Sequence, residues 1–373
     1  MSGLYIHIPF CRSKCPYCDF YSVGYEYNLA SRYIRAISKQ IKELHVSPET
    51  IYIGGGTPTV LPLITLKILF NKLKVFINKA DEITVEANPE SIDGDKLKYF
   101  LDSGVNRISI GVQSFNQRKL TRLGRPHSGR QARDSVFYAR KKGFMNISID
   151  LIFGVEAENL NIWKDDLKIS VDLPIEHISA YSLAYERGAQ LSRAAAAKKV
   201  IPLDDKKTAD MYKLTLSYLP AKGFTQYEVS NFSKRGYACR HNLNCWENNP
   251  YTGLGASAVS YACGVRERNV SKLEQYINMA KKGIKPVESS ERLSALKRAK
   301  ETAALKIRTK EGIDFRKFKD KTGFDILKIR GLELSQLAGR KLCRWRFKNG
   351  KKIGIFPTRR GFLFCDTLSS SML

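Results

Sequence analysis

The chain has few acidic residues and no long apolar run. Its 373 residues include 36 acidic and 63 basic side chains. No apolar stretch approaches the roughly 18 residues that a membrane-spanning helix needs. The first residues lack the charged and apolar regions of a secretory signal and lead directly into a strand pattern. We therefore expect a cytoplasmic protein, in which the eight cysteines are metal ligands or buried thiols rather than disulfides.

The basic residues are concentrated at the end of the chain. Residues 264–373 contain 28 basic and 11 acidic residues, a net charge of +17 out of +27 for the whole chain. Such a surface favours anionic partners, namely a carboxylate-rich ligand, an anionic membrane surface at which the protein would be peripheral, or nucleic acid. A proteome rich in lysine would give the same balance, because charge alone identifies no partner. Of these partners we regard nucleic acid as the weakest, and we also consider a homodimer.

Short apolar stretches alternate with amphipathic ones over the first half of the chain. The stretches expected to form strands are 4–8, 50–53, 82–85, 107–110, 146–152 and 177–181. Between them lie patterns typical of helices, at 27–44, 63–77, 93–103, 130–142 and 159–172. Short, almost continuously apolar strands separated by helices indicate a parallel sheet covered by helices. Six repeats predict an α/β fold with an open, partial (β/α)6 barrel, because a closed barrel has eight.

The pattern changes after residue 185 and again near residue 306. We expect residues 1–185 to form the partial barrel and residues 186–305 an accessory α/β region. Residues 306–373 contain two short helical patterns and then two apolar runs around Asn349-Gly350, a hairpin signal. Helices followed by a hairpin predict a small, basic, winged-helix-like domain. A winged helix suggests nucleic-acid binding, but we prefer packing against the barrel, because a fold alone does not determine a function.

Three cysteines follow the first expected strand within eight residues: Cys11, Cys15 and Cys18. This spacing lets three thiolates converge on one inorganic centre. A structural zinc site needs a fourth ligand, and none follows in the loop, so zinc would require completion from Cys239, His241 or Cys245. Three ligands on a four-iron cube instead leave one iron open to a substrate.

Polar or glycine-rich segments follow the later strands. Gly54-Gly55-Gly56-Thr57 ends the second strand, where glycines let the backbone approach a ligand closely. It lacks the Gly-Lys-Ser/Thr of a phosphate-binding loop. Side chains able to bind a ligand end the next strands or follow them, namely Glu86, Gln113, Arg125 and Asp150. A carboxylate can accept two ribose hydroxyls and an arginine can bind a carboxylate, although each residue alone is more often a cap or solvated.

The Cys-x-x-x-Cys-x-x-Cys segment after Tyr5-Ile6-His7-Ile8 resembles the radical S-adenosylmethionine (SAM) superfamily. More narrowly, it resembles the family of oxygen-independent coproporphyrinogen III oxidases and their haem-chaperone relatives. The resemblance implies a [4Fe-4S] cluster on Cys11, Cys15 and Cys18, whose open iron chelates SAM. It further implies that an electron from the cluster cleaves SAM to a 5′-deoxyadenosyl radical.

The same resemblance implies which residues contact the cofactors. Tyr17 matches an aromatic position beside the cluster and adenine, and the glycine segment matches the motif for the SAM amino group. The residues that it implies for SAM, or for a second SAM-like ligand, are Tyr5, Tyr17, Gly55, Gly56, Thr57, Glu86, Gln113, Arg125 and Asp150.

Two departures favour the chaperone branch over the oxidase. The first strand starts at residue 4 without the oxidase's N-terminal extension, and Asp19 follows Cys18 where the oxidase has a further cysteine. In addition, residues 239–246 resemble the His-Asn-x-x-Tyr-Trp motif of the chaperones, with Cys245 in place of the tyrosine. This motif implies that His241 is a haem ligand, as imidazole often is. The alternative is that His241 caps a loop by hydrogen bonding.

The sequence therefore predicts a haem chaperone that binds a [4Fe-4S] cluster, SAM and haem and delivers haem to an acceptor haemoprotein. A radical SAM enzyme that decarboxylates coproporphyrinogen III is the first alternative. The second is an RNA-modifying radical SAM enzyme that uses the basic C-terminal region.

Overall fold

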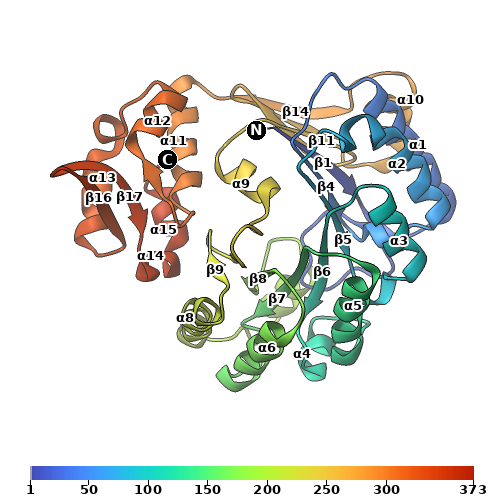
Figure 1. The fold of residues 1–373 in the computed structure, drawn as a ribbon, viewed down its shortest axis with the longest axis horizontal. Helices are drawn as coiled ribbons and strands as arrows, with labels where there is room; N and C mark the ends of the chain where they lie inside the picture. Colours follow the sequence, from blue (N-terminus) through green and yellow to red (C-terminus); the bar gives the residue numbers. More distant parts are fainter. Residues whose placement is uncertain (1) are drawn as a thin grey trace.

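A curved sheet of six parallel strands forms the centre of the computed structural model, which describes residues 2–373 (Figure 1). The strands neighbour one another in chain order, which confirms the six expected repeats: β1 (Gly3–Ile8), β4 (Thr50–Gly55), β5 (Glu82–Ala87), β6 (Arg107–Gln113), β7 (Ile147–Phe153) and β8 (His177–Ser182). The first strand, β1, does not pair with the last, β8, so the barrel stays open, as predicted.

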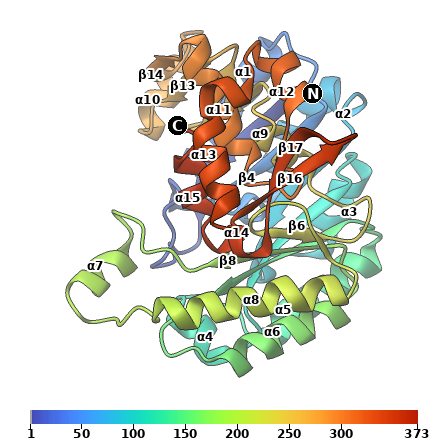
Figure 2. The ribbon, with the colours of Figure 1, turned by 90° about the vertical axis from the view of Figure 1, so that its left-hand side faces the viewer.

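Several helices between these strands begin at a residue whose side chain caps them. Ser128 and Gln131 form a capping box, and Asn159 accepts a hydrogen bond from the Ile162 N–H. The long helices are α1 (Tyr27–Lys42), α2 (Leu63–Ile77), α3 (Gly94–Asp102), α5 (Gly129–Lys142), α6 (Leu160–Asp172) and α8 (Asp205–Ala221). Shorter ones are η1 (Pro58–Val60), η2 (Pro89–Ser91), α4 (Gln117–Arg122) and α7 (Gln190–Ala196), which projects from the body in Figure 2.

The two faces of the sheet differ in polarity. Leu4, Ile6 and Ile8 of β1 are fully buried in the hydrophobic core that the helices share. The alternate residues Tyr5 and His7 belong to the opposite face, because successive side chains of a strand point to opposite sides. That inner face is largely polar, unlike the branched apolar layers that fill a closed barrel. A polar interior can bind a polar ligand.

The expected accessory region continues the barrel sheet at both edges. Beside β1 lies the parallel strand β11 (Tyr251–Leu254), followed by the antiparallel strands β12 (Val259–Ala262), β13 (Val265–Asn269) and β14 (Val287–Arg292). Beside β8 lie β10 (Asn231–Ser233) and β9 (Thr225–Gln226). Helix α10 (Leu273–Lys281) packs near α1, where Arg32 pairs with Glu274.

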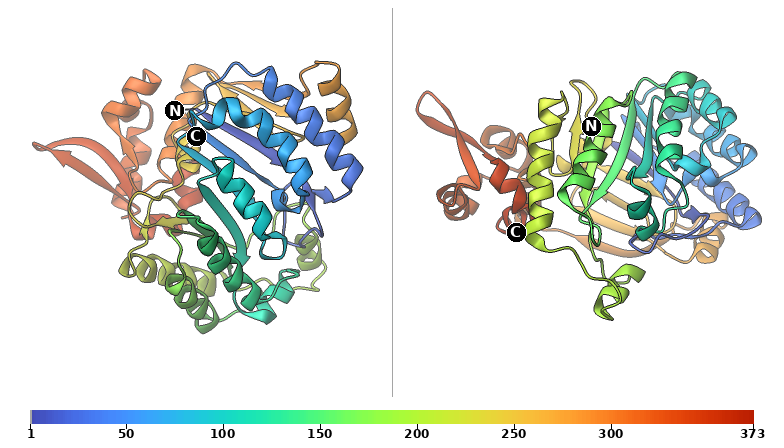
Figure 3. Two further views of the ribbon diagram at one scale, coloured as in Figure 1. Left: turned by 45° about the vertical axis from the view of Figure 1, so that its right-hand side comes forward. Right: turned by 90° about the horizontal axis from the view of Figure 1, so that it is seen from below.

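The last part of the chain has its own hydrophobic cluster, which includes Leu334, Leu337 and Ile355. Its elements are α11 (Ala295–Lys306), β15 (Ile313–Asp314), α12 (Phe315–Thr322), α13 (Ile326–Gly339), β16 (Cys343–Lys348), β17 (Lys351–Pro357), α14 (Arg359–Leu363) and α15 (Cys365–Ser370). Asn349 and Gly350 both have positive φ, as a tight hairpin turn requires. This winged-helix-like unit lies to one side of the barrel (Figure 3).

Helix α9 (Arg240–Trp246) closes the end of the barrel at which the parallel strands begin. Glu82, the first residue of β5, accepts hydrogen bonds from the N–H groups of Arg240 and His241, each 3.0 Å away. The Cys239 thiol lies 3.4 Å from the same carboxylate. One buried carboxylate therefore anchors the start of the helix. Among residues 2–373, no helix combines the length and hydropathy of a bilayer crossing.

Candidate cofactor site

The cysteine loop leaves β1 at the opposite end of the barrel from α9. Cys11 ends the short strand β2 (Phe10–Cys11), which pairs with β3 (Val23–Gly24) and so closes the loop. A turn from the Cys18 N–H to the Cys15 carbonyl, 3.0 Å, brings these two cysteines near each other. All three cysteines are free and partly exposed. Within residues 2–373, no three potential ligand side chains are already gathered at metal-binding distance. Three thiols on one loop are nevertheless the donor set of an iron–sulfur cluster.

Two polar side chains already hydrogen-bond these thiols. The Thr57 hydroxyl lies 3.7 Å from Cys11 Sγ, and Arg125 Nη1 lies 3.5 Å from Cys15 Sγ. Asn88 joins the two donors, because its Nδ2 donates to Thr57 Oγ1 at 2.9 Å and its Oδ1 accepts from Arg125 Nη2 at 2.7 Å. A continuous chain of hydrogen bonds thus runs from one cysteine to the other.

Glycines are needed where β4 meets the site. A Cβ on Gly54 would lie 2.7 Å from the Glu86 carboxylate. Gly55 has φ of +108°, and its Cβ would lie 2.3 Å from the His7 ring. A side chain at either position would displace a polar group of the site, since contacts this short are not tolerated. The glycine segment therefore brings backbone close to Glu86 and His7.

Glu86 is held from two sides at the end of β5. Its Oε2 accepts the Gly55 N–H at 3.0 Å, and its Oε1 accepts the Tyr52 hydroxyl at 2.7 Å. Burial raises the pKa of Glu86 to about 7, and the nearby Asp150 adds to the rise, whereas the bond from Tyr52 opposes it. The fixed carboxylate still has lone pairs free to accept hydroxyl groups, such as those of a ribose.

Tyr5 is oriented by His7, two residues along the same face of β1. The Tyr5 hydroxyl lies 2.8 Å from His7 Nδ1, and His7 Nε2 lies 2.9 Å from the Tyr21 carbonyl. Because a carbonyl can only accept, Nε2 carries the proton and Nδ1 accepts from Tyr5. Burial lowers the pKa of His7 and raises that of Tyr5, so both are neutral near pH 7.

The other residues expected to bind SAM surround the same site. Gln113, with φ of 64°, ends β6, and Asp150 in β7 has a pKa raised by burial. Tyr17 packs on Leu123, Ile152 and Val155. The Nε of Arg125 is buried without a hydrogen-bond partner. This unused donor beside the cysteine loop fits an anionic group such as the SAM carboxylate.

His241 lies away from this site, at the end of the barrel closed by α9. Its side chain is buried, with the residue only 6% exposed, and Nδ1 lies 2.9 Å from the Thr50 hydroxyl. Its ring stacks on Tyr52, whose hydroxyl reaches Glu86. Burial lowers the pKa of His241 to about 4. The structure thus brings the predicted cluster and SAM residues together and places the predicted haem ligand toward the other end of the barrel, with its ring centre 6.5 Å from that of Tyr5.

Sequence reasoning missed several polar residues of the inner face, namely His7, Tyr52, Asn88 and Arg107. Arg107 is only 2% exposed, and its Nε lacks a partner. A signal was available for one of them, because His7 follows Tyr5 by two residues in the same strand. Residues two apart in a strand share a face.

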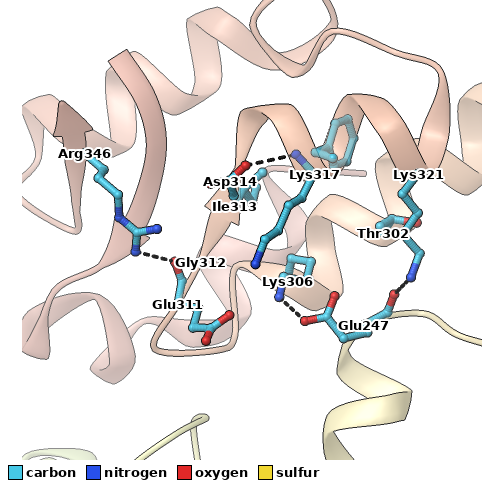
Figure 4. Close-up of a pocket in the computed structure, with 11 residues that line it drawn as sticks. Glu247, Thr302, Lys306, Glu311, Gly312, Ile313, Asp314, Lys317, Lys321 and Arg346 are labelled. Atoms are coloured by element: carbon cyan, nitrogen blue, oxygen red, sulfur yellow. Dashed lines mark hydrogen bonds and ion pairs between the residues drawn. The ribbon is translucent and has the colours of Figure 1, made fainter. Parts of the chain in front are cut away.

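A second feature is a pocket of about 350 Å³ beside the end of α9 (Figure 4). Four basic residues line it, namely Lys306, Lys317, Lys321 and Arg346. Lys306 pairs with the Glu247 carboxylate, and Lys321 donates to the Glu247 carbonyl. Among the described residues, the Lys317 ammonium has no hydrogen-bond or ion-pair partner. Three acidic residues, Glu247, Glu311 and Asp314, also line the pocket, so its lining has a net charge of +1 to offer an anionic group.

The Glu86 carboxyl should make stability depend on pH. Between pH 4.5 and 7 the unfolded chain releases this proton while the folded chain keeps it, so folding is disfavoured as the pH rises. We expect wild type to lose roughly 1–3 kcal/mol of unfolding free energy relative to Glu86→Gln across this window. Urea unfolding without SAM, over pH 4.5–8, measures the difference. Parallel profiles for the two proteins would contradict the assignment.

Comparison with known proteins identifies similar chains. Residues 5–168 match the radical SAM superfamily. Over 348 residues the chain is 35% identical to the haem chaperone HemW of Lactococcus lactis, covering 91% of this chain and 90% of that protein. It is 34% identical to HemW of Bacillus subtilis, covering 100% and 99%.

A solved structure has the same fold. Coproporphyrinogen III oxidase (HemN) of Escherichia coli, a radical SAM enzyme, aligns with a TM-score of 0.84 at 20% sequence identity. The alignment covers 100% of this chain and 89% of that one. At this identity the likeness supports the fold and not the activity.

Proposed function

We propose that this chain, which belongs to the haem chaperone family of the radical SAM superfamily, binds haem and delivers it to acceptor haemoproteins. The similarity to haem chaperones over almost the whole chain carries this proposal. The oxidase shares the fold at 20% identity, so its decarboxylation activity gains no comparable support.

The cofactors of this family are a [4Fe-4S] cluster and SAM, and the polar end of the barrel fits both. Cys11, Cys15 and Cys18 would hold the cluster, which supplies one electron when it is bound. The free Nε of Arg125 would pair with the SAM carboxylate, and Glu86 would accept ribose hydroxyls. Tyr5, Gly55, Gly56, Thr57, Gln113, Asp150 and Tyr17 would complete the SAM surroundings.

For haem, we propose His241 as the iron ligand, through Nε2. Nδ1 is engaged by Thr50, whereas Nε2 makes no hydrogen bond within residues 2–373. The residue is only 6% exposed, so a macrocycle reaches it only if α9 moves away from Glu82. Haem binding would then open the end of the barrel opposite the cluster loop.

The basic pocket beside α9 would attract the two haem propionates. Its wall includes Glu247, the residue after α9, so haem near this helix lies within reach of Lys306, Lys317 and Lys321. Exposed ion pairs contribute only about 0–1 kcal/mol each. The pocket would therefore steer haem, while iron ligation and burial of the macrocycle supply most of the affinity.

Replacing Cys11, Cys15 and Cys18 together by alanine should abolish the cluster, because no other thiol lies in the loop. We expect the reconstituted wild type to bind four irons and four sulfides, and the variant to lose them together with the visible absorbance. A Cys263→Ala variant, at an exposed cysteine elsewhere, controls for thiol loss. Full iron and sulfide in the triple variant, or zinc as the native metal, would refute the site.

His241→Ala should shift the Soret band and weaken haem binding by about tenfold or more, the effect of losing one ligand bond worth at least about 1.4 kcal/mol. The cluster spectrum should not change, because His241 lies at the other end of the barrel. His45→Ala, at an exposed histidine, is the matched control. Identical haem spectra and affinities in wild type and His241→Ala would show that His241 only caps α9.

Lys317→Glu should slow haem association severalfold at low salt, since it reverses the free charge in the pocket. Lys319→Glu, exposed on the same helix but outside the pocket, should leave the rate near that of wild type. Stopped-flow haem binding at two ionic strengths provides the measurement. Equal slowing by both variants would indicate a general charge effect.

One comparison separates the three candidate functions. Purified protein is assayed for haem uptake and transfer to an apo-haemoprotein, for coproporphyrinogen III decarboxylation, and for co-purified RNA. The proposal expects transfer of haem without decarboxylation or RNA. Contact with an anionic membrane surface and formation of a homodimer stay predictions.

A further inference from the structure

We infer that Asn88 is a positioning residue that directs hydrogen bonds onto the cluster ligands Cys11 and Cys15 and thereby raises the reduction potential of the cluster. The inference rests on the proposed cluster. Asn88 itself neither binds iron nor contacts a cysteine. It lies between Thr57 and Arg125, the two side chains that contact the cysteines.

The orientation of the Asn88 amide follows from its partners. Arg125 can only donate, so the atom 2.7 Å from its Nη2 must be the carbonyl oxygen Oδ1. The amide nitrogen Nδ2 then faces Thr57 and donates to its hydroxyl oxygen at 2.9 Å. No other assignment satisfies both contacts, because two donors would otherwise face each other.

This orientation determines where the Thr57 hydrogen points. A hydroxyl has one hydrogen and two lone pairs. Since Oγ1 already accepts from Asn88, its own hydrogen is available to Cys11 Sγ at 3.7 Å. On the other side, the bond to Oδ1, together with a bond to the Gly111 carbonyl at 3.0 Å, holds the guanidinium of Arg125, whose Nη1 donates to Cys15 Sγ at 3.5 Å. One amide thus orders a donor for each of two cysteines.

The surroundings hold Asn88 in place. Its backbone N–H donates to Ser91 Oγ at 3.2 Å, and the Ser91 hydroxyl returns a bond to the Asn88 carbonyl at 2.9 Å. Opposite the side chain lies Gly111, where a Cβ would fall 2.7 Å from Asn88 Oδ1. The bonds to Ser91 therefore fix the backbone of Asn88, and the lack of a side chain at Gly111 leaves room for its amide.

Hydrogen bonds to ligand sulfurs stabilise the more negatively charged, reduced cluster and raise its potential. Asn88→Asp retains the size of the side chain, its ability to cap η2 and an acceptor for Arg125. It removes only the donor to Thr57, whose hydrogen then turns to the new carboxylate and leaves Cys11. We therefore expect a more negative midpoint potential at unchanged iron and sulfide content.

The effect of the added negative charge on the potential must be distinguished from the effect of the lost hydrogen-bond donor. Asn106→Asp is a matched control, because Asn106 also bridges two groups, the Ile83 N–H and the Asp81 carbonyl, at the other end of the sheet. A double-mutant cycle with Thr57→Val distinguishes the two effects in a second way. If Asn88 acts through Thr57, the shift caused by Asn88→Asp should be smaller in the Thr57→Val background.

The potentials are measured by redox titration of the reconstituted, full-length proteins, followed by electron paramagnetic resonance. A shift in Asn88→Asp that exceeds the shift in Asn106→Asp and shrinks in the Thr57→Val background supports the inference. Equal potentials in wild type and Asn88→Asp, or fully additive shifts in the cycle, overturn it and leave the proposed haem function standing. A wild-type protein without a cluster overturns the inference together with the proposed cluster site, whereas the haem proposal is tested separately by His241→Ala.

Discussion

The parallel alignment of six strands is the constraint on which the rest of the structure depends. Parallel strands that neighbour one another in chain order bring all their carboxyl ends to one edge. Residues far apart in sequence, such as Thr57, Asn88 and Arg125, can therefore form one hydrogen-bonded chain around the cysteine loop. The helices cover the outer face with apolar contacts, so the inner face is free to be polar.

The two ends of the barrel are physically connected. Tyr52 stacks on His241 with its ring and donates to Glu86 with its hydroxyl. A displacement of His241 would remove a packing partner of this ring, and the hydroxyl holds a carboxylate of the proposed SAM site. Two binding events at opposite ends of the barrel would thus share one side chain.

Much of the fold followed from local patterns in the sequence. Short apolar runs separated by amphipathic ones predicted the six strands, and Asn349-Gly350 predicted the hairpin between β16 and β17. Local sequence patterns, however, do not show which strands pair with each other. The attachment of β11 to β1, and of β10 to β8, joins segments about 250 and 50 residues apart and could not be read from periodicity.

The candidate site was predictable to a similar degree. The cysteine spacing and the polar residues after each strand identified one edge of the barrel. The position of His241 depended on Glu82, which binds the start of α9 and lies about 160 residues earlier. Asn88 was overlooked because an asparagine before a proline is also typical of a turn. Only its bonds to Thr57 and Arg125 distinguish it.

The pairing of β1 with β11 also has a consequence for synthesis of the chain. Strand β1 leaves the ribosome about 250 residues before its second neighbour, β11, which ends at Leu254. Until β11 has been made, one edge of β1 has no strand beside it, and unpaired edges favour wrong association. Pairing of two strands so far apart in the sequence is also slow. The strand that leads into the cysteine loop therefore keeps an unpaired edge while about 250 further residues are synthesised.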